Sequence, residues 1–270
     1  MWDKPNELYA ILRCTNVKYA KKLVDIGSIK FNTPESWVEA ERESAKGRGD
    51  ILEGSFAACH PSDIEGVISY SRRYNDVYGK TLNDLTYFRR KRTMKLPCYC
   101  FYLLKQSSFE TPKKVGKQKI STTISSDYFR EFANNLSKED VHMLIEEERP
   151  AIVVINNIDQ FLMMIRNKLL SIGAKESEIL FEIIEYVDKM IPHYCAKDSP
   201  KELKLKDRYF QHQSEGRIIV NTNNKSVIDY LNKNPIEIGT IETIAKRADI
   251  YLDQGVLIEM NTDIYKIEED

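Results

Sequence analysis

Short runs of apolar residues separated by polar segments follow one another along the chain, and most of these runs have the length of a strand. Residues 8–13 form the first run, and Asn16 follows it in a position to cap a helix that Gly27 would end. Residues 28–32 alternate like a short strand, and Thr33-Pro34-Glu35 opens a second helix with proline in its first turn. Further strands are expected at residues 55–59, 96–104, 151–155, 217–221, 236–238 and 256–259.

The other segments indicate helices, loops and one surface excursion. Residues 60–94 are polar, rich in tyrosine and weakly patterned, which is typical of a lid, and the lysine-rich residues 113–119 indicate a loop. Residues 179–187 fit a strand or a helix. Helices are expected at residues 128–134, 139–148, 158–170, 226–232 and 241–251.

This order of elements predicts an α+β fold with a largely antiparallel sheet, because strands and helices mix without a regular alternation. A Rossmann fold is disfavoured, since no Gly-x-Gly-x-x-Gly follows a strand. No long linker divides the chain. We therefore expect one domain over residues 1–270, with a basic, tyrosine-rich insertion at about residues 60–120.

Composition narrows the class of protein. The formal net charge is −1, so the whole molecule is not a general polyanion binder. The start of the chain has no basic region before an apolar run, and no apolar stretch approaches the ~20 residues of a membrane span. The five cysteines lack the spacing of metal ligands. We expect reduced thiols in a cytoplasmic protein that has no metal site and does not contact a membrane.

Gln213-Ser214-Glu215, just before the apolar run 218–220, carries the strongest local indication of chemistry. Side chains two apart on an extended segment face the same way, so Gln213, Glu215 and Arg217 would project together. A carboxylate beside an amide suits a reaction that builds positive charge on a sugar ring, with Glu215 on a ribose hydroxyl and Gln213 orienting the nucleophile. The alternative is a surface ion pair of Glu215 with Arg217 and a solvated Gln213.

Arg13 ends the first apolar strand, at the other end of the chain. Its guanidinium is suited to bidentate bonds with a pyrophosphate, and the alternative is a partly buried arginine paired with an acid. Asp50 and Glu53 are a further polar pair, either at the same cleft or in a capped loop.

Arg13, Ser121-Thr122-Thr123 and Gln213-Ser214-Glu215 together resemble the Arg–Ser–Glu class of ADP-ribosyltransferases. Residues 12–15 and 27–34 are also similar to DarT-type prokaryotic domains. The resemblance covers both ends of the chain and leaves roughly residues 60–200 poorly matched. Tyr99 or Tyr102 is an alternative for the middle position of the motif.

The resemblance implies a split sheet flanked by helices, with NAD as a substrate. It assigns catalysis to Glu215 and Gln213, with the nicotinamide ribose near Glu215. Phe31 or Tyr9 would stack on the nicotinamide, and backbone groups after Arg13 would hold its amide. The residues expected to bind NAD are Arg13, Thr15, Phe31, Asn32, Tyr9 and Ser121.

Glutamine at the first motif position is associated in the family with acceptors other than arginine, including amides and nucleobases. The basic, tyrosine-rich residues 70–119 suit single-stranded nucleic acid, preferably RNA, because cations track phosphates and rings stack on bases. The alternative is a solvated charged surface. The resemblance thus extends to a CmdT-type toxin or antiphage effector that modifies messenger RNA and is controlled by an antitoxin. The expected contacts are Arg89, Arg90, Arg92 and Tyr87.

Two other functions remain open at this point. One is a protein-modifying ADP-ribosyltransferase or an NAD glycohydrolase that uses the same pocket. The other is a non-catalytic module that binds nucleic acid or a partner protein. Both enzyme interpretations require Arg13 and Glu215 to lie in one cleft.

Overall fold

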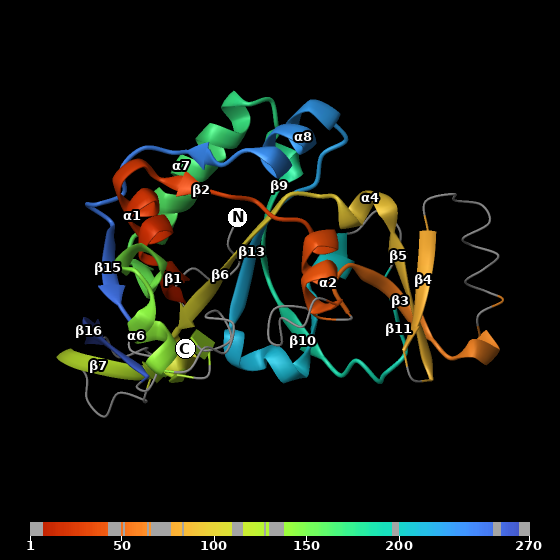
Figure 1. Cartoon of the computed structure of the whole chain (residues 1–270), viewed down its shortest axis with the longest axis horizontal. Helices are drawn as coiled ribbons and strands as arrows, with labels where there is room; N and C mark the ends of the chain where they lie inside the picture. Colours follow the sequence, from red (N-terminus) through yellow and green to blue (C-terminus); the bar gives the residue numbers. More distant parts are fainter. Residues whose placement is uncertain are drawn as a thin grey trace, which may run out of the picture.

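The computed structural model describes residues 8–42, 50, 52–63, 65, 77–82, 84–109, 116–126, 128–129, 138–195, 200–250 and 255–264. Helices and mostly antiparallel strands mix along these residues, which confirms the α+β class. Figure 1 shows the main sheet and a smaller sheet standing apart, with α2 (Pro34–Arg42) between them. Among the described residues, no helix combines the length and the apolar character needed to cross a membrane.

The main sheet has six antiparallel strands in the order β15-β8-β1-β6-β13-β9. β6 lies between β1 and β13, so the first strand and the strand after the Gln-x-Glu motif are separated by one strand only. The strands are β1 (Leu8–Asn16), β6 (Cys98–Lys105), β8 (Pro150–Ile155), β9 (Ile179–Ile183), β13 (Glu215–Val220) and β15 (Ala245–Asp249).

The main sheet splits between β1 and β6. Their pairing runs as far as Leu12 and Tyr102. Beyond this pair, the last residues of β1, from Arg13, continue with β8, whereas the first residues of β6, up to Phe101, continue with β13. The two halves of the sheet therefore separate at this end.

Apolar side chains cover both faces of the main sheet, because neighbouring residues of a strand point to opposite sides. Ile11 belongs to the core under the helices, and Leu12 belongs to the core under a two-stranded sheet. The helices are α1 (Val17–Ile26), α7 (Ile158–Ser171) and α8 (Lys225–Lys233), and the two strands are β7 (Gly116–Ile124) and β16 (Val256–Ile264).

The smaller sheet has the antiparallel order β11-β3-β5-β4. A parallel pair, β10 with β12, and an antiparallel pair, β2 with β14, complete the described strands. Their bounds are β2 (Ser28–Ile29), β3 (Ser55–Cys59), β4 (Val77–Leu82), β5 (Leu85–Arg90), β10 (Glu185–Val187), β11 (His193–Tyr194), β12 (Leu205–Asp207) and β14 (Ile236–Glu237). The short helices are α4 (Lys91–Met94) and α6 (Lys138–Met143).

Three expectations from the sequence are wrong in the described residues. Within residues 60–94, the segment Leu85–Arg90 does not belong to a surface excursion, because it forms β5, which is buried between β3 and β4. Residues 64, 66–76 and 83 of this range lie outside the described residues. The expected loop at 113–119 enters β7 from Gly116 onward. The expected helix at 241–251 is instead a turn followed by β15, because pairing with the buried β8 outweighs the helical pattern.

The first helix follows the capping expected from its sequence. The Asn16 side chain accepts a hydrogen bond from the Tyr19 N–H at 3.0 Å. Gly27 ends the helix in the left-handed conformation, with φ of 63°. A Cβ atom at Gly27 would also lie 2.3 Å from the Gly239 carbonyl oxygen, so both backbone geometry and space require glycine there.

We expect Gly27→Ala to destabilise the protein more than Gly173→Ala. Both glycines have positive φ, a strain of about 1–3 kcal/mol for alanine, but a Cβ at Gly173 meets its nearest neighbour, in Val227, at an ordinary 3.6 Å. The difference in the free energy of unfolding, from urea titrations, therefore reports the close approach of Ile238 and Gly239 to Gly27. Equal losses of stability in the two variants would contradict this account.

Candidate active site

A cleft of about 1020 Å³ opens where β1 and β6 separate. Arg13 and Thr15 of β1 lie in one wall, and Tyr99 lies at the start of β6. Gln213 and Glu215 line the same cleft from beyond β6. The split of the sheet therefore brings Arg13 and Glu215 into one cleft, as both enzyme interpretations require.

Ser214 bends the chain sharply inside the Gln-x-Glu motif. It joins the 3-10 helix η7 (Arg208–Gln213) to β13 and adopts the left-handed conformation, with φ of 38°. Its hydroxyl donates to the Leu103 carbonyl and its carbonyl accepts from the Leu103 N–H, both at 2.8 Å. The motif is thus not extended throughout, and the backbone strain at Ser214, on the order of 1–3 kcal/mol, is held by β6.

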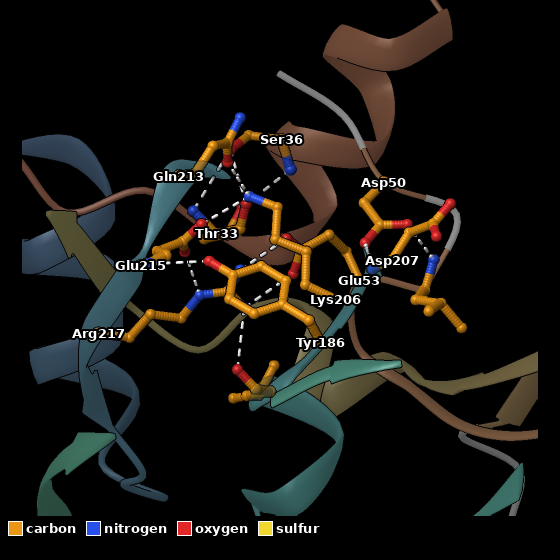
Figure 2. A network of polar contacts seen from close by, with 12 residues as sticks. Thr33, Ser36, Asp50, Glu53, Tyr186, Lys206, Asp207, Gln213, Glu215 and Arg217 are labelled. Atoms are coloured by element: carbon orange, nitrogen blue, oxygen red, sulfur yellow. Dashed lines mark hydrogen bonds and ion pairs between the residues drawn. The ribbon is translucent and has the colours of Figure 1, made fainter. Parts of the chain in front are cut away.

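The carboxylate of Glu215 lies between two cations (Figure 2). Arg217 Nε donates to Oε1 and Lys206 Nζ donates to Oε2, each at 2.5 Å. Lys206 Nζ also donates to Gln213 Oε1 at 2.6 Å. Burial alone would raise the pKa of Glu215, but the charges of Arg217 and Lys206 outweigh it and hold that pKa well below its usual range. Glu215 is therefore a carboxylate at every physiological pH.

Arg217 is held by a second carboxylate. Its Nη1 and Nη2 donate to the two oxygens of Glu53 at 2.8 and 2.6 Å, and Nη1 also donates to the Leu203 carbonyl at 2.9 Å. The guanidinium lies over the Trp37 ring, 4.8 Å from its centroid. Burial opposes the charge of Arg217, but Glu215 and Glu53 together raise its pKa well above the ordinary value.

Asp50 joins the turn that carries Glu53 to the segment that carries Lys206. Its Oδ1 accepts from the Leu52 N–H at 2.9 Å, and its Oδ2 accepts from the Asp207 N–H at 2.5 Å. Burial and the nearby charge of Glu53 raise the pKa of Asp50 to about 7. Glu53 and Lys206 therefore reach the cleft from segments that are fixed to each other.

The ion pair of Glu215 with Arg217, which was the simpler interpretation of the motif, is present but is not on the surface. Glu215 is 6% exposed and Arg217 is 0% exposed, and Gln213 is buried rather than solvated. Such a pair loses hydration on burial and is retained only when all its charges are compensated. The motif is a buried polar network whose edge lines a cleft.

Arg13 lines the same cleft from β1. Its Nη1 donates to the Cys100 carbonyl at 2.6 Å across the split, and the guanidinium lies 5.1 Å from the centroid of the Tyr99 ring. These contacts orient the guanidinium without neutralising it. A fixed cation at the edge of a cleft suits an anionic group of a ligand.

The other residues expected at the NAD site divide into two groups. Thr15 and Asn32 line the cleft. Phe31 is fully buried in the core, and Tyr9 packs edge-on against Phe109 at a bulge of β1, with centroids 5.1 Å apart. Ser121 lies in β7, paired with β16, away from the cleft lining. The structure therefore does not bring Phe31, Tyr9 or Ser121 to the cleft.

Most of the residues expected to contact RNA are buried or bonded to other residues of the protein. Arg89 and Tyr87 are each 1% exposed, so the expectation that they bind RNA at the surface is wrong. Arg90 is half-buried, donates to Glu202 at 2.5 Å and lies over the Phe56 ring. Arg92 is exposed and donates to Asn221 at 3.0 Å. The same expectation included other residues, of which the structure describes only Tyr78. These residues are Tyr70, Tyr74, Tyr78, Arg72, Arg73 and residues 110–115.

Four residues of the site were missed or only partly foreseen. Glu53 was one of two alternatives for a polar pair, whereas Lys206, Trp37 and Tyr186 had no distinguishing pattern. The Tyr186 hydroxyl accepts from the Glu215 N–H at 2.8 Å. Tyr19, Trp37 and Tyr99 are the aromatic residues in the cleft lining, which contains neither Phe31 nor Tyr9. Their roles depend on tertiary contacts that no sequence spacing records.

Comparison with protein-family models, with curated proteins and with solved structures finds no match to this chain. Within the described ranges, no group of three or more His, Cys, Asp or Glu side chains is arranged to hold a metal ion. The site is therefore interpreted from its own geometry.

The charge balance of the network is open to a direct test. Glu215→Gln leaves Lys206 uncompensated, because Arg217 retains Glu53, and we expect the free energy of unfolding to fall by about 3–5 kcal/mol. Adding Lys206→Met restores the balance, so the double variant should be more stable than Glu215→Gln alone. Urea unfolding at pH 7 gives the coupling energy. Additive effects of the two substitutions would contradict the proposed pairing.

Proposed function

We propose that the protein is an NAD-dependent ADP-ribosyltransferase that transfers ADP-ribose to nucleic acid, preferably RNA. One observation carries the proposal: Arg13 and Glu215, from opposite ends of the chain, line a single cleft at the split of the sheet. The volume of about 1020 Å³ is at the upper end of the ~300–1,000 Å³ typical of small-molecule sites, as a dinucleotide requires. The resemblance seen in the sequence points to the same pair of residues.

In this reaction the bond between the ribose C1′ and the nicotinamide nitrogen breaks. Its electrons pass to the nitrogen, neutral nicotinamide leaves, and positive charge builds on the ribose. The ionised Glu215 would stabilise that charge and accept a hydrogen bond from a ribose hydroxyl. An acceptor atom then bonds to C1′ and loses a proton. Gln213 would orient the acceptor.

The cleft also contains the groups that an NAD molecule needs at its other parts. Arg13 would bind the pyrophosphate, and Thr15 and Asn32 lie beside it in the lining. Trp37 lines the cleft and is partly exposed, so it replaces the expected Phe31 and Tyr9 as the ring available to the nicotinamide, whereas Tyr99 borders the cleft but is 3% exposed.

The residues that we propose to bind RNA lie at the rim of the cleft, and they replace residues 70–119 of the sequence-based prediction. Tyr19, Lys22 and Lys30 line the cleft and are exposed, with 55% exposure for Tyr19. Cations with an exposed ring suit the phosphates and unpaired bases of a single strand. We extend the proposal to a cytoplasmic toxin or antiphage effector, which a protein antitoxin would control.

The proposal is tested by incubating the protein with labelled NAD and, separately, RNA, DNA and cell protein. We expect release of nicotinamide and label on RNA. Label on protein, or free ADP-ribose without an acceptor, would identify a protein-modifying transferase or an NAD glycohydrolase instead. RNA binding without any consumption of NAD would leave a non-catalytic module and would refute the enzyme.

Glu215→Gln should lower kcat for nicotinamide release by about 100-fold or more, because the variant lacks the charge that stabilises the ribosyl cation. Assays are run where urea titration shows the variant to be folded. Glu237→Gln, an exposed residue of β14, is the matched control and should keep wild-type kcat. Wild-type kcat in folded Glu215→Gln would exclude the assigned role.

The rim is tested with Lys22→Glu/Lys30→Glu. This variant should label RNA more weakly while nicotinamide release persists. Its RNA binding should also depend less on salt, with a log–log slope that is shallower by about 0.7 for each phosphate that the rim no longer neutralises. Lys175→Glu/Lys225→Glu makes the same charge change at exposed residues outside the cleft lining. Equal effects of the two pairs would assign the result to net charge and not to the rim.

A further inference from the structure

We propose that Lys206 is a positioning residue that fixes Gln213 and Glu215 relative to each other by binding both with a single ammonium. The inference rests on the proposed function for the reaction in which these residues act. Its structural part stands on the contacts in the cleft.

Lys206 contacts both functional side chains of the motif. Its Nζ lies 2.6 Å from Gln213 Oε1 and 2.5 Å from Glu215 Oε2 (Figure 2). The side chain is buried and borders the cleft. Because Ser214 bends the backbone between them, the relative placement of the amide and the carboxylate depends on what they bind in common. Lys206 is that common partner.

The small parallel sheet β10–β12 holds Glu215 at two points. Tyr186 and Lys206 are register partners in this sheet. The Tyr186 hydroxyl accepts from the Glu215 N–H at 2.8 Å, and Lys206 binds the carboxylate of the same residue. Asp207, the next residue, donates its N–H to Asp50 and so ties the sheet to the turn carrying Glu53. Lys206 is therefore presented by a segment that is itself fixed.

Charge explains why the residue is a lysine. Glu53 and Glu215 carry two negative charges, and Arg217 and Lys206 carry two positive charges, in one buried chain of contacts. Arg217 is bonded to both carboxylates, so Lys206 supplies the charge that completes the balance. The ammonium also lies 5.0 Å from the centroid of the Phe210 ring.

These contacts exclude a role for Lys206 as a base or nucleophile. An amine must lose its proton to act in either way. Burial favours the neutral amine, but the charges of Glu215 and Glu53 raise the pKa of Lys206 above its ordinary value. Its effect on the reaction is exerted through Gln213 and Glu215.

The test compares Lys206→Met with Lys206→Arg and uses Lys204→Met as the matched control. Lys204 precedes β12 and pairs with Glu182, outside the cleft lining. In folded Lys206→Met we expect kcat for nicotinamide release to fall by about 100-fold, because misplaced groups lower the rate by that much. The acidic limb of the pH–kcat profile should move to higher pH, since Glu215 then has one cation fewer. Lys206→Arg should recover part of the rate and the acidic limb, and Lys204→Met should match wild type.

Nuclear magnetic resonance separates this inference from the proposed function. In wild type, the carboxyl carbon of Glu215 should titrate well below the usual range of a glutamate, and in Lys206→Met it should titrate at higher pH. Wild-type kcat and an unmoved acidic limb in folded Lys206→Met would overturn the positioning role. If wild type releases no nicotinamide, the proposed function fails. An unchanged Glu215 titration in Lys206→Met would overturn the structural part as well.

Discussion

The arrangement of the cleft depends on the buried carboxylate of Glu215, which has a cation on each oxygen. An uncompensated buried charge costs several kcal/mol, so Lys206, Arg217 and Glu53 have to be present together with it. These residues come from the turn before β3, from β12 and from β13. The requirement for neutrality therefore fixes three segments that are distant in sequence, and it fixes them at the end of the sheet where the strands separate.

A buried ion pair is by itself weak evidence for a catalytic site, because such pairs are also structural. The ion pair of Glu215 with Arg217 differs from a purely structural pair in its position. The network does not end in the core, because its residues line the cleft, and Arg13 is part of the same lining. A carboxylate that is already ionised and held needs no reorganisation as charge develops on a substrate, which is the condition for electrostatic stabilisation.

Local patterns predicted local structure well. Asn16 and Gly27 correctly predicted the first helix, and the apolar runs predicted most strands of the main sheet. The predictions that the β5 segment is exposed and that residues 241–251 form a helix were wrong. Burial and strand pairing depend on neighbours that the local sequence pattern does not contain. Similarly, the two-residue spacing after Gln213 predicted that Glu215 and Arg217 belong to the site. Lys206 and Tyr186 reach the motif through the parallel strands β10 and β12, and no spacing in the sequence reveals this strand pairing.

The charged groups that line the cleft bear on where each substrate of the proposed reaction would bind. The wall with Arg13 presents a cation whose hydrogen bond goes to a carbonyl, and the wall with Glu215 presents a network whose charges cancel. In the proposed reaction the anionic pyrophosphate of NAD would bind at Arg13, and the carboxylate of Glu215 would face the ribose, where positive charge develops. A nucleic acid strand is anionic along its length and gains nothing beside Glu215, so its phosphates are better placed at Lys22 and Lys30 on the rim. For the proposed reaction, these charges therefore favour binding of the NAD pyrophosphate at Arg13 inside the cleft and of the nucleic acid at the rim.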